Sequence, residues 1–277
     1  MTLAAIEAPS CTISMNVLII LSGIADAKLQ LPRPVSAETL QALRASHALL
    51  SPFDEAALEL GLKLRDADPT VQLTALVAAS TAQDKLLQHV ASFRLDAVLA
   101  YPVQQIPAWN SRALATGLSS LVKAQTGSTP DLVLIGREFG DEDDGGVPAV
   151  TAHALGWPLV SQAMHVQHDA TGVLQILRQF GTVQEVLTQA MPAVAAVTNH
   201  ARNKLRHPLL KNVMAAKKMQ FTLQPLPQDT AVATLTLASV DQASTPERTE
   251  QCQMITGDVN TQARALAQLL LISGETP

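Results

Sequence analysis

Four consecutive acidic residues and a glycine pair follow a short apolar run in DLVLIGREFGDEDDGGVPA, residues 131–149. The apolar run, 132–135, predicts a buried strand, and Pro148 favours the start of a helix after the loop. Three kinds of site fit this pattern. Adjacent aspartates suit a Mg²⁺ cluster, and glycines let backbone N–H groups approach a nucleotide phosphate at a helix N-terminus. Acidic side chains also stabilise a helix N-terminus in an ordinary solvated turn.

The rest of the sequence does not choose among these three readings by spacing. The seven histidines form no HxxxH pair and no HExxH motif that could complete a metal site with the acidic residues. The sequence also contains no GxSxG, Walker loop or GxGxxG, so a nucleophilic hydrolase or an NAD dehydrogenase has no motif support. We therefore predict neither catalytic nor metal-binding residues.

The composition predicts an ordinary packed protein that does not bind nucleic acid. Of the 277 residues, 47% are hydrophobic and 16% are charged, which excludes global disorder. Aromatic residues make up only 3% and the formal net charge is −5. A nucleic-acid binder would need aromatic stacking platforms and a basic surface.

Cysteine usage and the early sequence indicate a cytoplasmic protein. Cys11 and Cys252 are the only cysteines and have no metal-site spacing, which is typical of a reduced intracellular protein. The apolar run 17–21 is too short for insertion into a membrane. Residues 1–14 contain no Lys or Arg and resemble neither a secretory signal nor a mitochondrial transit peptide.

Alternating strands and helices predict an α/β fold with a doubly wound, mostly parallel sheet, because the strand runs are almost continuously apolar. Ser51 should be the N-cap of the clearest helix, with Pro52 at its first position and Asp54 three residues after the cap. Beyond Trp157-Pro158 the sequence has strand-like runs with a hairpin turn at 169–172, then a basic, proline-punctuated region without a clear period, 199–230. The other expected elements are strands 17–21, 72–79, 95–101 and 131–136, and helices opening near Thr81, around 107–125 and at 259–272.

Three blocks of sequence resemble the β subunit of electron-transfer flavoproteins, across most of residues 15–221. SPFDEAALELGLKLRD, from Ser51, resembles the family's NPF-x-E-x-A-x-E-x-A helix start. DLVLIGREFGDEDDGG, followed by GWP, resembles its DLVLLGK-x-x-x-DDD nucleotide loop and WP turn. MPAVAAVTN, then Arg206, Leu210 and NVMAAKK (212–218), resemble its LPAV-x-T segment, recognition loop and N-I-M-K-A-K-K stretch. The order and spacing of the blocks together make the resemblance specific.

The resemblance implies a Rossmann-like adenine-nucleotide-binding fold that holds an AMP with a structural role. At the phosphate end, the family's Asn-Gln-Thr-Gly tail is replaced by 145–148, GGVP, so only backbone N–H donors remain there. Some relatives bind a second FAD here with a DGDTAQVG-like loop, which this sequence matches only in part. Carried over by position, the cofactor-binding residues are Ile20, Ser51, Pro52, Phe53, Asp54, Ala79, Gly136, Arg137, Glu138, Phe139, Gly140, Asp141, Glu142, Asp143, Asp144, Gly145, Gly146 and Val147.

The resemblance also implies partners. The chain would pair with an FAD-binding α subunit and carry electrons from flavin dehydrogenases towards a quinone reductase, without catalytic residues of its own because the flavin does the chemistry. Position matching makes Leu210 the residue that docks the dehydrogenase. One extra residue after Pro192 keeps Leu209 as an alternative, and Arg206 lies beside both.

The predicted organisation is an N-terminal extension (1–14), an α/β nucleotide-binding domain (15–198), and a C-terminal partner-docking loop and arm (199–277). We expect the last region to need another surface to pack against. Two other functions stay open. One is a stand-alone adenine-nucleotide-binding regulatory protein of the same fold. The other is an adenylate-forming or nucleotide-hydrolysing enzyme that uses the aspartates with Mg²⁺, although the loop lacks Ser, Thr or Lys donors for a phosphate.

Overall fold

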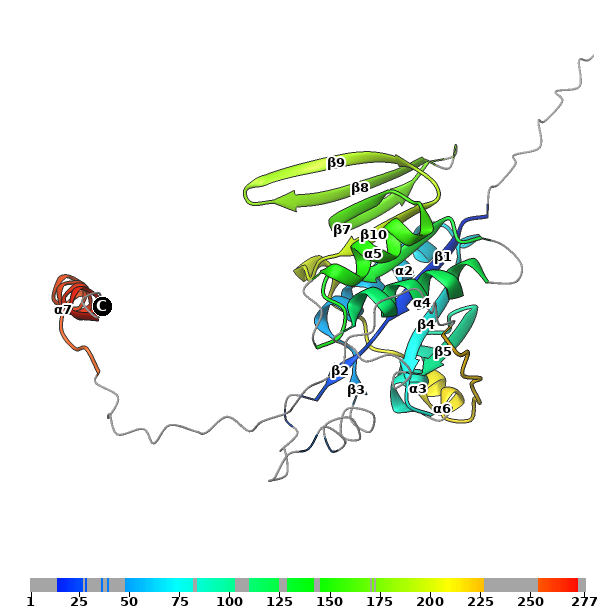
Figure 1. Cartoon of the computed structure of the whole chain (residues 1–277), viewed down its shortest axis with the longest axis horizontal. Coiled ribbons are helices and arrows are strands. Elements are labelled where there is room, and N and C mark those ends of the chain that lie inside the picture. The colour runs from blue at the N-terminus through cyan, green and yellow to red at the C-terminus, as the bar shows by residue number, and fades with distance from the viewer. Residues whose placement is uncertain are drawn as a thin grey trace, which may run out of the picture. The chain divides into compact units, whose positions relative to one another are not determined.

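A computed structural model describes residues 14–26, 28, 36, 39, 48–81, 84–102, 110–124, 129–141, 145–169, 171, 173–226 and 254–273 (Figure 1). The chain divides into two compact units, Met1–Val240 and Asp241–Pro277. The extension predicted for residues 1–14 lies outside the described residues except for Ser14. In the second unit the structure describes one helix, α7 (Val259–Ser273).

The first unit is built on an eight-stranded sheet in the order β5-β4-β1-β6-β10-β7-β8-β9. The strands from β5 to β7 are parallel, and β8 and β9 continue the sheet in antiparallel pairs. These pairings confirm the doubly wound, mostly parallel α/β fold. The strands of this sheet are β1 (Asn16–Leu21), β4 (Gln72–Ala79), β5 (Ala97–Pro102), β6 (Leu132–Gly136), β7 (Leu159–His168), β8 (Val173–Phe180), β9 (Val183–Ala190) and β10 (Ala193–Val197).

Helices cover both faces of the sheet, because the strands are apolar on both sides. Along β1, Leu18 and Ile20 point into one hydrophobic core, and Ile19 and Leu21 point into another. In Figure 1, α4 and α5 lie in front of the sheet and α2 lies behind it. Among the described residues of this unit, the helices are α2 (Pro52–Ala67), α3 (Lys85–Ala91), α4 (Ser111–Lys123), α5 (Gly146–Leu155) and α6 (Leu210–Ala216), with a 3-10 turn η1 (Ala201–Asn203) and a small sheet of β2 (Ile24–Ala25) and β3 (Ala48–Leu49).

Most of the elements expected from the sequence are present within a few residues. The strand 72–79 matches β4, and the turn predicted at 169–172 joins the antiparallel pair of β7 and β8. The expected start of a helix near Thr81 is wrong by four residues. A turn comes first, and α3 begins at Lys85 because Asp84 caps it by accepting the Leu86 N–H at 2.8 Å.

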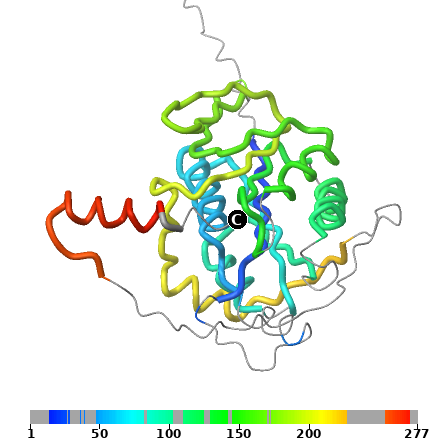
Figure 2. Tube along the Cα trace, turned by 60° about the vertical axis from the view of Figure 1, so that its left-hand side comes forward, coloured from blue at the N-terminus to red at the C-terminus, as the bar shows by residue number. Residues whose placement is uncertain are grey.

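Residues 199–226, which we call the strap, wrap around the first unit. Figure 2 shows this yellow segment running beside the light-blue α2. Further along, Ala216 and Phe221 are buried in the core on the α2 side, and Leu226 is buried in the core on the other side. Between Phe221 and Leu226, the backbone N–H of Gln224 donates to the Ala100 carbonyl of β5 at 2.7 Å. The expectation that the chain beyond 198 needs another surface therefore does not hold for the strap, which packs on its own domain.

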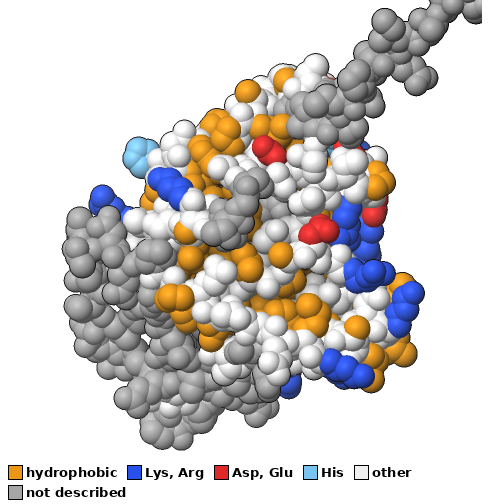
Figure 3. Space-filling model, turned by 90° about the vertical axis from the view of Figure 1, so that its right-hand side faces the viewer, with side chains coloured by type: hydrophobic (Ala, Val, Ile, Leu, Met, Phe, Trp, Pro, Cys, Tyr) orange, Lys and Arg blue, Asp and Glu red, His pale blue; other side chains and the backbone are white. Residues whose placement is uncertain are grey.

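One face of the molecule shows few charged side chains, in agreement with the low charged fraction of the sequence. A space-filling view of one face shows hydrophobic side chains spread among polar ones, with Lys and Arg gathered mainly along one margin (Figure 3). Within the described ranges, no helix is long and apolar enough to cross a bilayer.

Helix α2 begins with a capping box, as its sequence predicts. The Ser51 hydroxyl accepts the Asp54 N–H at 2.9 Å, and the Asp54 carboxylate accepts the Ser51 N–H at 3.1 Å. The same carboxylate accepts N–H groups of Ser22 (3.3 Å) and Gly23 (3.0 Å), which follow β1. Asp54 is fully buried, and burial raises its pKa, against the opposing effect of these hydrogen bonds. One carboxylate therefore fixes the helix start and the loop after β1.

We expect Asp54→Ala to lower the free energy of unfolding by about 2–4 kcal/mol, because it removes the cap and leaves buried N–H groups without an acceptor. Chemical denaturation of the purified variants measures this effect. Glu55→Ala, in the same helical turn, is the matched control and should change stability by less than about 1 kcal/mol. Equal losses in the two variants would contradict the role of Asp54.

Candidate functional site

The candidate site lies at the carboxyl ends of three neighbouring strands, β4, β1 and β6. The chain proceeds from β1 to β4 and β5 on one side, then returns to place β6 on the other side of β1. Strand order therefore reverses between β1 and β6, where their registered pairs end at Ile20 and Ile135. Open parallel sheets bind ligands outside the carboxyl ends of their strands at such a point. We call this region the switch-point edge.

The loop after β6 packs tightly on the start of α2. A side chain at Gly136 would lie 2.9 Å from the Cβ of Phe53 and 3.1 Å from the Glu138 carbonyl, so this close approach requires glycine. The Arg137 guanidinium lies 5.1 Å from the centre of the Phe53 ring and pairs with the Glu138 carboxylate. The loop after β6 and the start of α2 are therefore in direct contact at the switch-point edge.

Asp141, the first acid of the run, joins the loop after β6 to the short strand β2. Its Oδ2 accepts the backbone N–H of Ala25, in β2, at 3.0 Å. Asp141 is exposed, so this contact organises backbone at the surface. The next three acids, Glu142, Asp143 and Asp144, lie outside the described residues. In the part of the chain that the structure describes, no three His, Cys, Asp or Glu residues are grouped to hold a metal ion.

Helix α5 begins differently from α2. Its N-cap is Gly145, at φ 99°, which has no side chain of its own to accept an N–H of the first turn. The left-handed backbone at residue 145 favours glycine. The space around it does not, because a Cβ added there would lie 3.6 Å from the Arg137 carbonyl oxygen, an ordinary van der Waals contact. Gly146, the first helical residue, is exposed, and Val147 is buried. The cap residue of α5 therefore has no side chain, whereas the start of α2 carries a capping box with a carboxylate.

Those predicted cofactor-binding residues that the structure describes lie at the switch-point edge, but not all of them face outwards. Ile20 and Ala79 are almost completely buried and belong to the two separate hydrophobic cores. Phe139 is also buried, in the same core as Ile20. These side chains support the edge from within, while Pro52 lies exposed on it.

Two residues at this edge, Ser80 and Asp84, follow β4 and were not predicted from the sequence. The Asp84 carboxylate accepts the backbone N–H and the hydroxyl of Ser80, at 3.1 and 2.9 Å. The signal available was their position directly after a buried strand, the same rule that pointed to the loop after β6.

The predicted docking leucines lie on the strap, where α6 begins. Leu209 is its N-cap and is 60% exposed, and Leu210 is its first residue and is 77% exposed. Met214, one turn along, is 53% exposed. Leu205, by contrast, packs against the core. We call Leu209, Leu210 and Met214 the α6 patch; Lys211, Lys217 and Lys218 are exposed around it in sequence.

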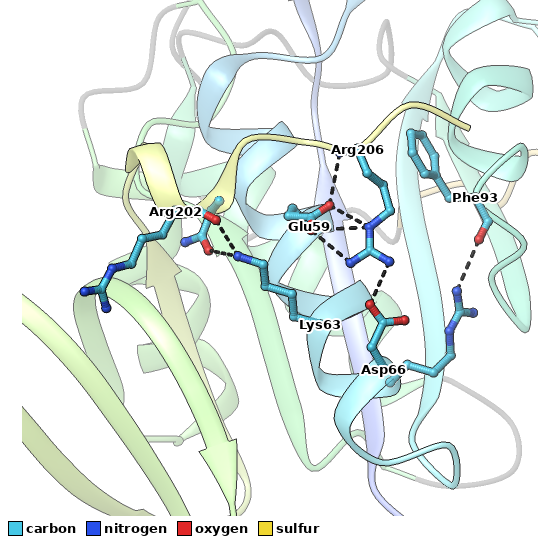
Figure 4. A network of polar contacts seen from close by, with 8 residues as sticks. Glu59, Lys63, Asp66, Phe93, Arg202 and Arg206 are labelled. Atoms are coloured by element: carbon cyan, nitrogen blue, oxygen red, sulfur yellow. Dashed lines mark hydrogen bonds and ion pairs between the residues drawn. The ribbon is translucent and has the colours of Figure 1, made fainter. Parts of the chain in front are cut away.

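Arg206 differs from the prediction that groups it with the docking leucines. Its guanidinium pairs with two carboxylates of α2, Glu59 at 2.9 Å and Asp66 at 2.7 Å (Figure 4). The hydrogen bonds that it donates to Glu59 raise the pKa of Arg206. The cation is therefore held by two acids of its own chain, which the sequence did not predict.

The sequence is similar to proteins of one known family. The family model described as electron transfer flavoprotein domain matches residues 39–247. Proteins named electron transfer flavoprotein subunit beta are similar to the chain: that of Syntrophomonas wolfei is 28% identical over 171 residues, covering 61% of this chain and 65% of the relative. That of Megasphaera elsdenii is 29% identical over 180 residues, covering 62% and 65%.

The chain thus matches somewhat less than two thirds of the length of these two relatives. The protein of the same name from Mycobacterium bovis is 27% identical over 186 residues, covering 66% of this chain and 68% of the relative. The matched family region includes the start of α2, the loop after β6 and the whole strap. The chain therefore belongs to the electron transfer flavoprotein family, where its relatives are beta subunits.

Proposed function

We propose that this chain is the β subunit of a heterodimeric electron-transfer flavoprotein. It pairs with an FAD-binding α subunit and carries electrons from flavin dehydrogenases towards a quinone reductase. The observation that carries the proposal is the family match over residues 39–247, which spans both the switch-point edge and the strap. When bound, the flavin supplies the electron chemistry, and this chain supplies binding and docking surfaces.

The switch-point edge is proposed to hold an AMP. The start of α5 fits a phosphate, because the glycines at 145 and 146 allow a close approach to the backbone and the helix dipole favours an anion there. The α2 start does not fit a phosphate, since the buried Asp54 carboxylate already occupies it. The phosphate is therefore assigned to 145–147, and α2 supports the edge by fixing the loop after β1.

Helix α7 supports the proposed α subunit as partner. Asp258 caps this helix by accepting the Thr261 N–H at 2.8 Å, so the helix start is well defined. Its four leucines are nevertheless exposed within their own unit: Leu266 by 51%, Leu269 by 49%, Leu270 by 66% and Leu271 by 75%. Leu266, Leu269 and Leu270 share one helical face. A helix that exposes such a face gains its stability by packing on another surface.

The α6 patch is proposed to dock the dehydrogenase. An exposed leucine among charged residues is how transient docking sites are built: the apolar side chain enters a pocket of the partner, and the charges steer the encounter. Leu210 is the more exposed of the two leucines, 77% against 60% for Leu209. We therefore assign the anchoring role to Leu210.

Co-expression tests the heterodimer. The chain expressed alone should aggregate or behave poorly, because the apolar face of α7 is left uncovered. Co-expressed with its α subunit, it should give a 1:1 complex with one flavin, measured by light scattering and by the flavin absorbance. A well-folded monomer that carries adenine nucleotide and ignores the α subunit would instead support a stand-alone regulatory protein.

A valine at Gly146 tests the phosphate assignment. Gly146→Val should reduce the bound AMP at least tenfold, because its branched side chain blocks the approach of the phosphate to the backbone at the start of α5. Mass spectrometry of the denatured complex measures the nucleotide. Ala149→Val, at an exposed position of the same helix, is the control and should retain it. Unchanged nucleotide in Gly146→Val would remove this loop as the phosphate site.

Shortening the side chain of Leu210 to alanine tests the docking site. In the intact complex, Leu210→Ala should lower the rate of electron acceptance roughly tenfold, about 1.4 kcal/mol, because one anchor carries much of such an interface. The rate is measured by stopped flow with a panel of purified flavin dehydrogenases, each reduced by its own substrate. Flavin content and melting temperature should stay constant. A drop in stability with a normal rate would assign Leu210 to packing instead.

A further inference from the structure

Helix α2 carries a second buried acidic residue, Glu59, further along the helix than Asp54. Glu59 is only 5% exposed, on a helix whose neighbouring positions Leu58 and Leu60 are completely buried. A carboxylate in such a place is unfavourable unless it is paired and hydrogen-bonded. The burial of Glu59 therefore needs an explanation. The proposed AMP site does not explain it, because Asp54 already fixes the start of the helix.

The partner of Glu59 is a single residue of the strap, held in two ways. The backbone N–H of Arg206 donates to Oε2 at 3.2 Å. Its side chain donates from Nε to Oε2 at 3.0 Å and from Nη2 to Oε1 at 2.9 Å. Because Glu59 binds both backbone and guanidinium of the same residue, it fixes the position of the chain at 206 as well as the direction of the side chain. Asp66, two turns along α2, binds the remaining end of the guanidinium at 2.7 Å.

A second contact fixes the strap three residues earlier. The Lys63 ammonium, between Glu59 and Asp66 on α2, donates to the Arg202 carbonyl and, at 3.2 Å, to the Asn203 side-chain oxygen. The Asn203 amide in turn donates to the Met164 carbonyl at 2.8 Å. Met164 lies where a bulge interrupts the pairing of β7 with β8. Asn203 is 2% exposed and so joins α2, β7 and the strap at one buried point.

These contacts come immediately before the α6 patch. Arg206 lies three residues before Leu209, and Pro208 stands between them. After the patch, Ala216 is buried against the core at 1% exposure. The two exposed leucines therefore lie on a short span that is fixed at both ends, and Figure 4 shows the strap running across α2 with the three α2 side chains turned towards it.

We infer that Glu59, assisted by Asp66, is a positioning residue for docking: through Arg206 it holds the strap so that the α6 patch meets the electron donor preformed. This inference rests on the proposed function of the α6 patch. A preformed loop binds a partner faster and more tightly than one that must be ordered on contact, because the ordering entropy has already been lost on folding. Leu210 makes the contact, and Glu59 acts only through the strap.

Glu59→Gln in the complex with the α subunit tests this inference without reference to function. Glutamine keeps the shape and one acceptor but loses the charge that binds the Arg206 fork. Hydrogen exchange, followed by mass spectrometry, should become at least fivefold faster in peptides covering 203–216 and stay constant in β4 and β6. Arg202→Ala is the matched control, since its guanidinium points away from the network (Figure 4) and should leave exchange unchanged.

The second arm measures electron acceptance from the dehydrogenase in the panel that reduces the wild-type complex fastest. Glu59→Gln should lower the second-order rate constant about fivefold in the wild-type background and less than twofold in Leu210→Ala, because positioning matters only while the anchor is present. Should Glu59→Gln not fold, Arg206→Lys replaces it, since lysine keeps the charge beside Glu59 but not the fork.

Unchanged exchange in the strap overturns the positioning role of Glu59. Faster exchange with an unchanged rate constant overturns its link to docking, as does a fivefold effect that persists in the Leu210→Ala background. If no dehydrogenase reduces the wild-type complex, the proposed function fails, and the exchange experiment still decides whether Glu59 holds the strap.

Discussion

Two buried carboxylates on α2, at Asp54 and Glu59, hold separate segments of chain by their backbone N–H groups. Removing the partner of a buried charge destabilises a protein by about 3–5 kcal/mol, so such contacts tolerate little displacement. Asp54 holds the loop after β1, and Glu59 holds the strap through Arg206. The helix between them is a rigid rod, with a rise of about 1.5 Å per residue. Contacts to the same helix, α2, therefore help to position both the switch-point edge and the α6 patch.

The two helix starts at the switch-point edge have different roles for a simple chemical reason. A helix N-terminus attracts one negative charge, and at α2 the chain supplies that charge itself. At α5 the cap residue is a glycine, which supplies no charge of its own. Aspartates near the edge do not contradict an anionic ligand when they are already bound by backbone, as Asp84 is by Ser80 and Asp141 is by Ala25.

Sequence reasoning predicted the elements whose information is local. Strand β4 is one apolar run, and Ser51, Pro52 and Asp54 mark the start of α2 in the sequence. The strap could not be predicted in this way, because long-range ion pairs and two separate cores hold it and leave no period in its sequence. Arg206 shows the limit most clearly. A cation beside exposed leucines has the same sequence pattern whether its carboxylate lies on another protein or, as here, on α2 of the same chain.

The path of the strap decides where the chain can be cut. A shortened chain that ends after β10, at Val197, would contain the whole sheet and would look complete by strand count. It would nevertheless leave Glu59 buried without a cation, and it would remove Phe221 and Leu226 from the two cores. The smallest fragment expected to fold therefore extends through Leu226, well past the last strand. Boundaries chosen from secondary structure alone would yield an unstable fragment of this protein.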